Sequence, residues 1–252
     1  MVDRYLRPWK ARAYAPLLRP LAAVPADAVT VVGMAVGLAA AAAAAVGSFE
    51  WALVGWWANR WLDGLDGELA RAAALRRAAG VAASPRGPAP LRRPAHGRRF
   101  APMRGAYLDL MADLLVYAAV PLGLAAGAAG SLTGAPLADP SWVWAAAALA
   151  LASFYLNLGS YALLAPALSA AEAASAGSAP AGTPAANADP NAPGLRMPAG
   201  LIEGAETIVV FSVALAWPAW AAVTLATIGV LTLAGALQRS AWGLRRLGRL
   251  AA

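Results

Sequence analysis

The 252-residue sequence contains no cysteine and a single histidine, His96. Without cysteine the chain has no disulfide, no catalytic thiolate and no cysteine-ligated metal site. One histidine is too few for a histidine metal cage. Charge is also scarce, because 13% of the residues are charged and 60% are hydrophobic. A water-soluble domain of this length needs a more polar exterior, so this composition excludes an ordinary soluble globular protein.

The hydrophobic residues form long blocks, which indicates lipid as the solvent. Several blocks are long enough to cross about 30 Å of hydrocarbon at about 1.5 Å per residue. We predict six spans, near 28–47, 51–71, 106–129, 142–164, 200–217 and 219–238. Residues 1–20 are basic and carry aromatic side chains, which predicts an N-terminal interfacial amphipathic helix. The expected fold class is therefore an all-α membrane protein with six transmembrane helices.

The basic residues orient these spans. Arginines and one lysine precede the first span, nine arginines lie from Arg71 to Arg104, and four more follow the sixth span. The loops near 48–50, 130–141 and 218 contain neither Lys nor Arg. The positive-inside rule then places both termini and the arginine-rich loop in the cytoplasm. A net charge of +7 would suggest nucleic acid for a soluble protein. Here the charges mark topology, and no nucleic-acid partner is expected.

Two segments of biased composition interrupt what we expect to be a single membrane domain over residues 1–252. One, near 72–104, is rich in Arg, Ala and Pro, and the other, near 166–199, is rich in Ala, Ser, Gly and Pro. Such compositions do not build a packed core, so we predict two flexible cytoplasmic insertions. The arginines of the first are suited to anionic lipid headgroups.

Seven of the thirteen acidic residues fall inside or at the ends of predicted spans. They are Asp63, Asp66, Glu68, Asp109, Asp113, Glu203 and Glu206. Each costs roughly 2.5–3.5 kcal/mol at the centre of a membrane helix, so they are not expected to face lipid unpaired. All map to the cytoplasmic half of the predicted topology, which indicates one site.

Four aspartates form two pairs with helical spacing. Asp63 and Asp66 are three residues apart, and Asp109 and Asp113 are four apart, so each pair projects from one face of its helix. Four carboxylates brought together would repel one another unless a cation held them ionised. Oxygen ligands without histidine or cysteine favour Mg²⁺, Mn²⁺ or Ca²⁺ over zinc. The pairs therefore predict a site for one or two divalent ions against a phosphate-bearing substrate.

Read together, these residues resemble the signature of the CDP-alcohol phosphotransferase (CDP-alcohol phosphatidyltransferase) family, Asp-x2-Asp-Gly-x2-Ala-Arg followed by Gly-x3-Asp-x3-Asp. All eight fixed positions are present: Asp63, Asp66, Gly67, Ala70, Arg71, Gly105, Asp109 and Asp113. The chain departs from the family pattern between the two halves. Here 33 residues, 72–104, separate Arg71 from Gly105, where the family has a much shorter stretch.

The resemblance implies an enzyme of phospholipid biosynthesis that transfers a substituted phosphate from a CDP-linked donor to an alcohol and releases CMP. It implies that Mg²⁺ or Mn²⁺ is held by Asp63, Asp66 and Asp109, with Asp113 on or near the metal. Asp113 is also the expected general base for the acceptor hydroxyl. The expected nucleotide-binding residues are Thr30, Gly67, Ala70, Arg71 and Gly105.

The expected substrates are CDP-diacylglycerol and a small polar alcohol, with the protein in the bacterial plasma (inner) membrane. Glu203, Glu206 and Arg196 are candidates for acceptor binding or for support of the site. Family members are often homodimers, and oligomeric state stays open here. Two alternatives also stay open. One is transfer of a CDP-linked headgroup to diacylglycerol, and the other is an intramembrane cation transporter, although no second copy of the aspartate pairs is present.

Overall fold

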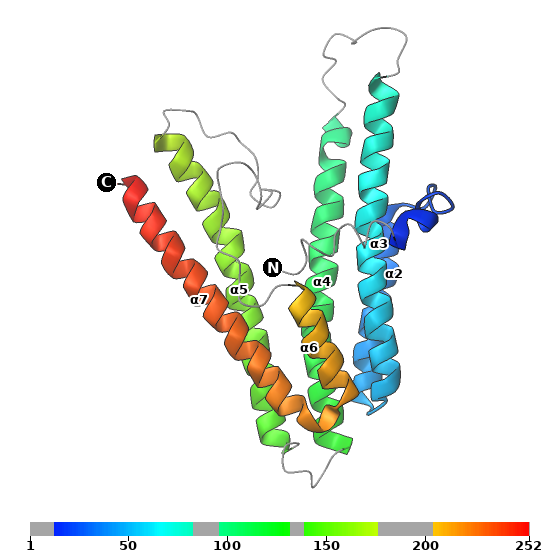
Figure 1. The fold of residues 1–252 in the computed structure, drawn as a ribbon, viewed down its shortest axis with the longest axis vertical. Coiled ribbons are helices and arrows are strands. Elements are labelled where there is room, and N and C mark those ends of the chain that lie inside the picture. Colours follow the sequence, from blue (N-terminus) through cyan, green and yellow to red (C-terminus); the bar gives the residue numbers. More distant parts are fainter. Residues whose placement is uncertain (1–12, 83–95, 132–138, 176–203, 252) are drawn as a thin grey trace. The chain divides into compact units, whose positions relative to one another are not determined.

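The computed structural model describes residues 13–82, 96–131, 139–175 and 204–251, and these residues are helical apart from short turns (Figure 1). The helices are α2 (Ala26–Ala45), α3 (Phe49–Ala82), α4 (His96–Ser131), α5 (Pro140–Ser175), α6 (Gly204–Ala216), the 3-10 helix η3 (Pro218–Trp220) and α7 (Ala221–Ala251). A further helical segment covers 13–18. No strand occurs in this part of the chain, which confirms the predicted all-α class.

Four helical stretches within the described ranges are long and apolar enough to cross a membrane. They are Ala26–Ala45, Arg104–Gly130, Pro140–Glu172 and Pro218–Leu250. A shorter apolar helix, Ala205–Ala216, precedes the last of them. Helix α3 has the length of a span, but charged residues such as Arg60 and Asp63 interrupt its apolar run. Composition therefore supports four of the six predicted spans.

Several helices extend beyond the spans predicted from the sequence. Helix α3 continues to Ala82 and α4 begins at His96, so both helices enter the arginine-rich insertion. Helix α5 likewise continues to Ser175, through Pro166 and into the second insertion. Alanine and arginine have high helix propensity, which favours these extensions. The rest of both insertions, at 83–95 and 176–203, and residues 1–12 of the predicted amphipathic helix lie outside the described residues.

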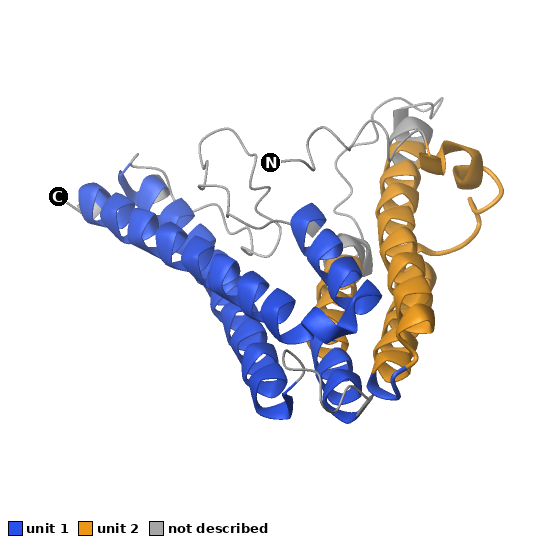
Figure 2. Cartoon of the chain, turned by 60° about the horizontal axis from the view of Figure 1, so that its bottom comes forward, with its two compact units in different colours: residues 1, 45–47, 121–252 blue, residues 2–44, 48–120 orange. Residues whose placement is uncertain are grey.

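The chain forms two compact units (Figure 2). Unit 2 comprises residues 2–44 and 48–120, and therefore contains α2, α3 and the first part of α4. Unit 1 comprises residues 1, 45–47 and 121–252, and contains the end of α4 with α5, α6, η3 and α7. The division within α4 falls at Pro121, a residue that has no backbone N–H to donate to the preceding turn. Both halves of the aspartate signature belong to unit 2.

Glycines allow α2 to approach α3 and α4 closely within unit 2. A Cβ atom on Gly55 of α3 would lie 2.9 Å from the Cβ of Ala40 on α2. A Cβ atom on Gly37 of α2 would lie 2.6 Å from Val116 Cγ2 on α4 and 2.9 Å from Asn59 Nδ2 on α3. Small residues at such contacts are typical of membrane helix packing. They set the backbone spacing on which the site described below depends.

Helices α5 and α7 pack along much of their length in unit 1 (Figure 1). Gly229 of α7 lies against the backbone of α5, because a Cβ atom there would be 3.1 Å from the Ala150 nitrogen. The same pair of helices buries a charge, Arg239 of α7. Its Nη1 donates to Asn157 Oδ1 (2.9 Å) and to Ser160 Oγ (2.7 Å), and its guanidinium lies 3.4 Å from the Tyr161 ring centroid. Polar and aromatic groups of α5 thereby solvate this arginine.

Two turns show how the sequence ends and begins helices. Gly47 ends α2 in the left-handed region, with φ 79°, and the Ser48 N–H donates to the Ala43 carbonyl (2.9 Å). Asp139 precedes α5 and accepts hydrogen bonds from the hydroxyl and the N–H of Ser141. These bonds lower the pKa of Asp139 below its usual value. Pro140 then takes the first helical position, where a missing N–H costs nothing.

The close contact at Gly229 predicts a specific loss of stability. Gly229→Val adds a branched side chain against the α5 backbone, and overpacking of this kind lowers the free energy of unfolding by about 1–3 kcal/mol. The matched control is Gly159→Val on α5, since a Cβ at Gly159 meets no atom within 4 Å. Thermal unfolding of both variants in detergent micelles measures the difference. Equal midpoints would contradict a tight α5–α7 contact.

Candidate active site

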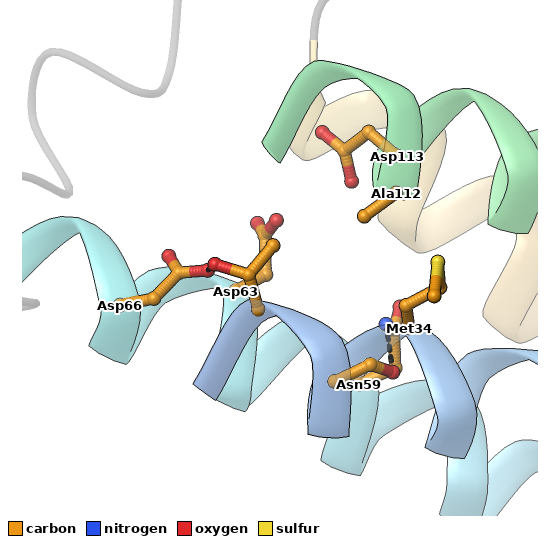
Figure 3. Close-up of a pocket in the computed structure, with 8 residues that line it drawn as sticks. Met34, Asn59, Asp63, Asp66, Ala112 and Asp113 are labelled. Carbon is orange, nitrogen blue, oxygen red and sulfur yellow. Dashed lines mark hydrogen bonds between the residues drawn. The ribbon is translucent and has the colours of Figure 1, made fainter. Parts of the chain in front are cut away.

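A small pocket in unit 2 is lined by residues from α2, α3 and α4 (Figure 3). Its lining comprises Thr30, Gly33, Met34, Asn59, Asp63, Asp66, Ala112 and Asp113. Three of the four predicted aspartates are among these residues, and they come from both halves of the signature. The two halves of the signature therefore line one pocket, although 33 residues separate them in the sequence.

Helix geometry explains which aspartates reach the pocket. Asp63 and Asp66 are one turn apart on α3, so both point to the same side of that helix. Asp113 faces the pocket from α4. Asp109 is exposed one turn earlier on α4 and does not line the pocket, although it interacts electrostatically with Asp66 and Asp113. The structure thus brings three carboxylates together and places the fourth beside them.

Thr30 of α2 holds the most buried of the three carboxylates. Its hydroxyl lies 2.6 Å from Asp66 Oδ2 and 3.2 Å from the Ala26 carbonyl oxygen one turn earlier. Asp66 is only 5% exposed, so a hydrogen bond to its charged form is needed to offset the loss of water. Thr30 is predicted to bind the nucleotide. In the structure its hydroxyl contacts an aspartate of the signature.

Arg60 of α3 supplies a positive charge to the same pocket region. Its Nη2 donates to Asp113 Oδ1 (3.0 Å), and its Nη1 lies 3.8 Å from Asp63 Oδ2. The Arg60 side chain is 6% exposed, whereas those of Asp63 and Asp113 are each 36% exposed. The cation is therefore buried beneath two carboxylates that remain accessible.

Asn59 connects this charge to α2. Its side-chain oxygen accepts from Arg60 Nε (2.8 Å) and Nη2 (2.6 Å), and its Nδ2 donates to the Gly33 carbonyl (2.8 Å; Figure 3). The absence of a side chain at Gly33 leaves room for Leu62 of α3, which would lie 3.3 Å from a Cβ atom there. One amide therefore fixes both the packing of α2 and the position of the guanidinium.

Tyr14 packs beside the first aspartate pair. Its hydroxyl donates to the Trp61 carbonyl (3.0 Å), and its ring centroid lies 4.7 Å from that of Trp61. The ring occupies the space above Gly64, where any side chain would clash with it. Burial, together with the charges of Asp63 and other nearby acids, raises the pKa of the Tyr14 hydroxyl above its usual value. The hydroxyl therefore stays a donor at neutral pH.

The remaining signature residues lie toward the later turns of α3 and the start of α4. Arg71 is 65% exposed and pairs with Glu68 (2.7 Å), not with an aspartate of the signature. Its guanidinium lies across Gly67, 3.5 Å from where a Cβ atom would be, and Ala70 is exposed nearby. Gly105 of α4 faces Asp27 of α2, whose Oδ1 would be 3.2 Å from a Cβ atom. Glycine here permits a close contact between α2 and α4.

The described part of the chain includes one of the three residues predicted for acceptor binding or for support of the site. Glu206 lies in the first turn of α6, in unit 1. Glu203 and Arg196 lie outside the described residues. Their expected roles stay predictions.

The donor chemistry of the pocket suits a hard divalent cation. Three carboxylates and one hydroxyl offer only oxygen ligands, which is the preference of Mg²⁺ and Mn²⁺. As the side chains are placed, no three acidic or histidine side chains among the described residues are close enough together to bind one ion. Arg60 and Thr30 engage Asp113 and Asp66 instead. The residues fit the ion by type, and their rotamers must adjust to coordinate it.

Comparison with known proteins assigns the chain to a family. No family model matches the sequence. The crystal structure of Mycobacterium tuberculosis phosphatidylinositol phosphate synthase (PgsA1) with CDP-DAG bound has a TM-score of 0.58 over 94% of each chain, and its 22% identity makes this a likeness of fold. Inner membrane protein YnjF of Escherichia coli (strain K12) is 30% identical over 240 residues, which cover 92% of this chain and 89% of that protein. The chain belongs to the CDP-alcohol phosphatidyltransferase family.

Two residues at the site were not predicted from the sequence: Asn59, which lines the pocket, and Arg60, which contacts Asp63 and Asp113. Neither belongs to the eight-residue signature that characterises the family. A signal was present, because Arg60 is a charged residue inside a predicted span and stands three residues before Asp63. An arginine one turn from an acid on the same helix face indicates an ion pair, and intramembrane charges are expected to pair.

Loss of the Thr30 hydroxyl is expected to destabilise this family member. Thr30→Val keeps the shape of the side chain but leaves buried Asp66 without its shortest hydrogen bond. The free energy of unfolding should fall by about 1–3 kcal/mol, measured by thermal unfolding in micelles. Thr227→Val is the matched control, since Thr227 donates only to a carbonyl of its own helix (2.8 Å). A loss no larger in Thr30→Val than in the control would contradict a stabilising Thr30–Asp66 bond.

Proposed function

We propose that the protein is an integral-membrane phospholipid-biosynthesis enzyme. It transfers the phosphatidyl group of CDP-diacylglycerol to a small polar alcohol and releases CMP, with Mg²⁺ or Mn²⁺ as cofactor. The observation that carries the proposal is the meeting of Asp63, Asp66 and Asp113 on one pocket, although they come from two halves of a signature that a long insertion separates. Membership of the CDP-alcohol phosphatidyltransferase family supports it.

The choice of donor is supported by the neighbouring fold and by the apolar surroundings. The Mycobacterium tuberculosis synthase of the same fold was crystallised with CDP-DAG bound. In unit 2, large apolar side chains such as Val31, Val32 and Trp57 are exposed on helices that carry pocket residues. Such surfaces suit acyl chains, while the carboxylates suit a metal-bound diphosphate. A lipid-linked nucleotide has both parts.

Asp63, Asp66 and Asp109, with Asp113 at or beside the ion, would hold the divalent metal. When bound, the metal neutralises charge on the diphosphate and makes CMP a better leaving group. Thr30 fixes the Asp66 carboxylate by its hydrogen bond and so limits the positions that Asp66 can take. Exposed Arg71 is placed to bind phosphate once it leaves Glu68. Gly67, Ala70 and Gly105 are the small residues of the signature that we assign to the nucleotide side of the site.

Asp113 is the residue we assign to proton transfer. Its carboxylate accepts the proton of the acceptor hydroxyl while that oxygen forms a bond to the phosphorus next to the diacylglycerol moiety. The bond from this phosphorus to the bridging oxygen breaks, and CMP leaves with that oxygen. Asp113 is 36% exposed, which gives a polar acceptor access to it.

The proposed membrane topology follows from the charges. Helices α3 and α6 are counted as spans alongside the four apolar stretches, which gives six spans in one domain over residues 1–252. Both termini, the insertions and the pocket then lie on the cytoplasmic side of the bacterial inner membrane. Residues 1–20 lie at the interface, consistent with the helical segment at 13–18 and the packing of Tyr14. A cytoplasmic pocket gives access to soluble alcohols, with Glu203, Glu206 and Arg196 as candidates for recognising them.

A direct assay tests the activity and the donor. Purified protein with Mg²⁺ or Mn²⁺ and CDP-diacylglycerol should release CMP when a suitable alcohol is supplied from a panel, including glycerol 3-phosphate, inositol phosphate and serine. Chelation by EDTA should abolish release, and added Mg²⁺ should restore it, because three carboxylates cannot neutralise the diphosphate. A second arm supplies CDP-linked alcohols with diacylglycerol. Turnover only in that arm would reverse the donor assignment, and none in either would overturn the proposed function.

Replacement of the proposed base gives the second test. Asp113→Asn keeps the shape but cannot take a proton, so kcat should fall by about 10²–10⁴-fold. Asp139→Asn is the control, because Asp139 is an exposed acid at the start of α5 and asparagine also caps helices. CMP release under saturating donor and acceptor measures both variants. Full turnover by Asp113→Asn would remove Asp113 from the proton transfer.

A further inference from the structure

The proposed reaction leaves one buried charge at the pocket without a role. Arg60 is absent from the family signature, yet its guanidinium contacts two of the three pocket aspartates. A charged side chain in an apolar helix is costly unless it is paired. Because Arg60 is buried, it is neither a solvated surface charge nor one of the loop arginines that orient the spans. Its side chain is only 6% exposed, so it is not available to neutralise a phosphate in solution.

The guanidinium is fixed by groups other than the aspartates. Asn59 Oδ1 accepts from both Nε (2.8 Å) and Nη2 (2.6 Å). The carbon of the guanidinium lies 4.9 Å from the ring centroid of Trp56 on α3 and 4.9 Å from that of Tyr117 on α4. Two aromatic faces and one amide thus hold a planar, permanently charged group in one orientation. The orientation of the guanidinium is therefore set by the protein itself, without a contribution from substrate.

The fixed guanidinium constrains Asp113 unequally at its two oxygens. Nη2 donates to Oδ1 at 3.0 Å, and no hydrogen bond to Oδ2 is found among the described residues. The terminal torsion of an aspartate is otherwise broad, so an untethered carboxylate samples many orientations. Asp63 is held less closely, since its nearest approach to Arg60 is 3.8 Å. The constraint therefore acts mainly on the residue assigned to proton transfer.

We propose that Arg60 is a positioning residue for the transfer reaction, which holds Asp113 by Oδ1 and directs Oδ2 to the acceptor hydroxyl. The proton of that hydroxyl passes to Oδ2 as the new phosphorus–oxygen bond forms and CMP departs. This inference rests on the proposed function. It also assigns different roles to the aspartates, because Asp63 and Asp66 would bind the metal more directly than Asp113 does.

Arg60→Gln, Arg60→Lys and the control Arg76→Gln test the positioning role. Arg76 is exposed on the same helix and bonds only to the Ala72 carbonyl (3.2 Å). Arg60→Gln should lower kcat by roughly 10–100-fold, since displacement of a reacting group by about 1 Å costs that much, while the donor KM stays unchanged. Arg60→Lys should recover part of the loss, because it restores the charge without the planar fork. Unchanged kcat in Arg60→Gln overturns the proposal.

Mn²⁺ binding without substrate separates positioning from general damage to the pocket. A cation beside the carboxylates repels a metal ion, so Arg60→Gln should bind Mn²⁺ as tightly as the wild type or more tightly, by electron paramagnetic resonance titration. Asp66→Asn should weaken binding in the same titration. If Arg60→Gln weakens Mn²⁺ binding as much as Asp66→Asn does, Arg60 shapes the whole site and the specific role is wrong.

A double-mutant cycle provides a readout that does not need turnover. Thermal midpoints of Arg60→Gln, Asp113→Asn and the double variant should be non-additive, because each single change breaks the same ion pair. Additive midpoints would show that no such tie exists. A wild type that releases no CMP would instead overturn the proposed function and the proton-transfer role with it, while non-additivity would still establish the tie. The two failures are therefore distinguishable.

Discussion

The site depends on how the free-energy cost of placing several carboxylates in an apolar helix bundle is offset. Burying an unpaired carboxylate is costly, and several together add mutual repulsion. In unit 2 this cost is offset at two places, where the Thr30 hydroxyl binds Asp66 and the Arg60 guanidinium binds Asp113. The side chains of Asp63 and Asp113 nevertheless remain 36% exposed. A divalent ion and a nucleotide diphosphate would complete the compensation during the proposed reaction.

Close packing of helices makes these contacts reachable. Thr30 lies on α2, its partner lies on α3, and Asp113 lies on α4, so small errors in helix spacing would break each bond. Gly33 and Gly37 bring α2 against its neighbours, and Asn59 bonds to the Gly33 carbonyl (2.8 Å) while holding Arg60. The glycines and the charges are therefore parts of one arrangement.

Unit 1 also contains a buried charge, and the groups that surround it differ from those in unit 2. Arg239 on α7 is almost completely buried, and the contacts of its guanidinium include Asn157, Ser160 and the face of Tyr161 on α5. An amide, a hydroxyl and a ring therefore contribute to the solvation of this cation. In both units a buried arginine also joins two helices, α3 to α4 and α5 to α7. Buried charge thus contributes to helix pairing as well as to the proposed chemistry.

The sequence by itself determined the helical class, the apolar stretches and the two aspartate pairs, because hydrophobic length and helical spacing are local properties. Helix periodicity predicted that the members of each aspartate pair share one helix face, and in the structure Asp63, Asp66 and Asp113 line one pocket. Only the tertiary structure showed that Asp109 lies outside the pocket lining, that Thr30 bonds Asp66, and that Arg60 lies beneath Asp63 and Asp113. These features depend on which helices meet and at what depth, and residues far apart in sequence decide that. The extension of α3 to Ala82 was also missed, because a composition rich in Ala and Arg is compatible both with a loop and with a helix.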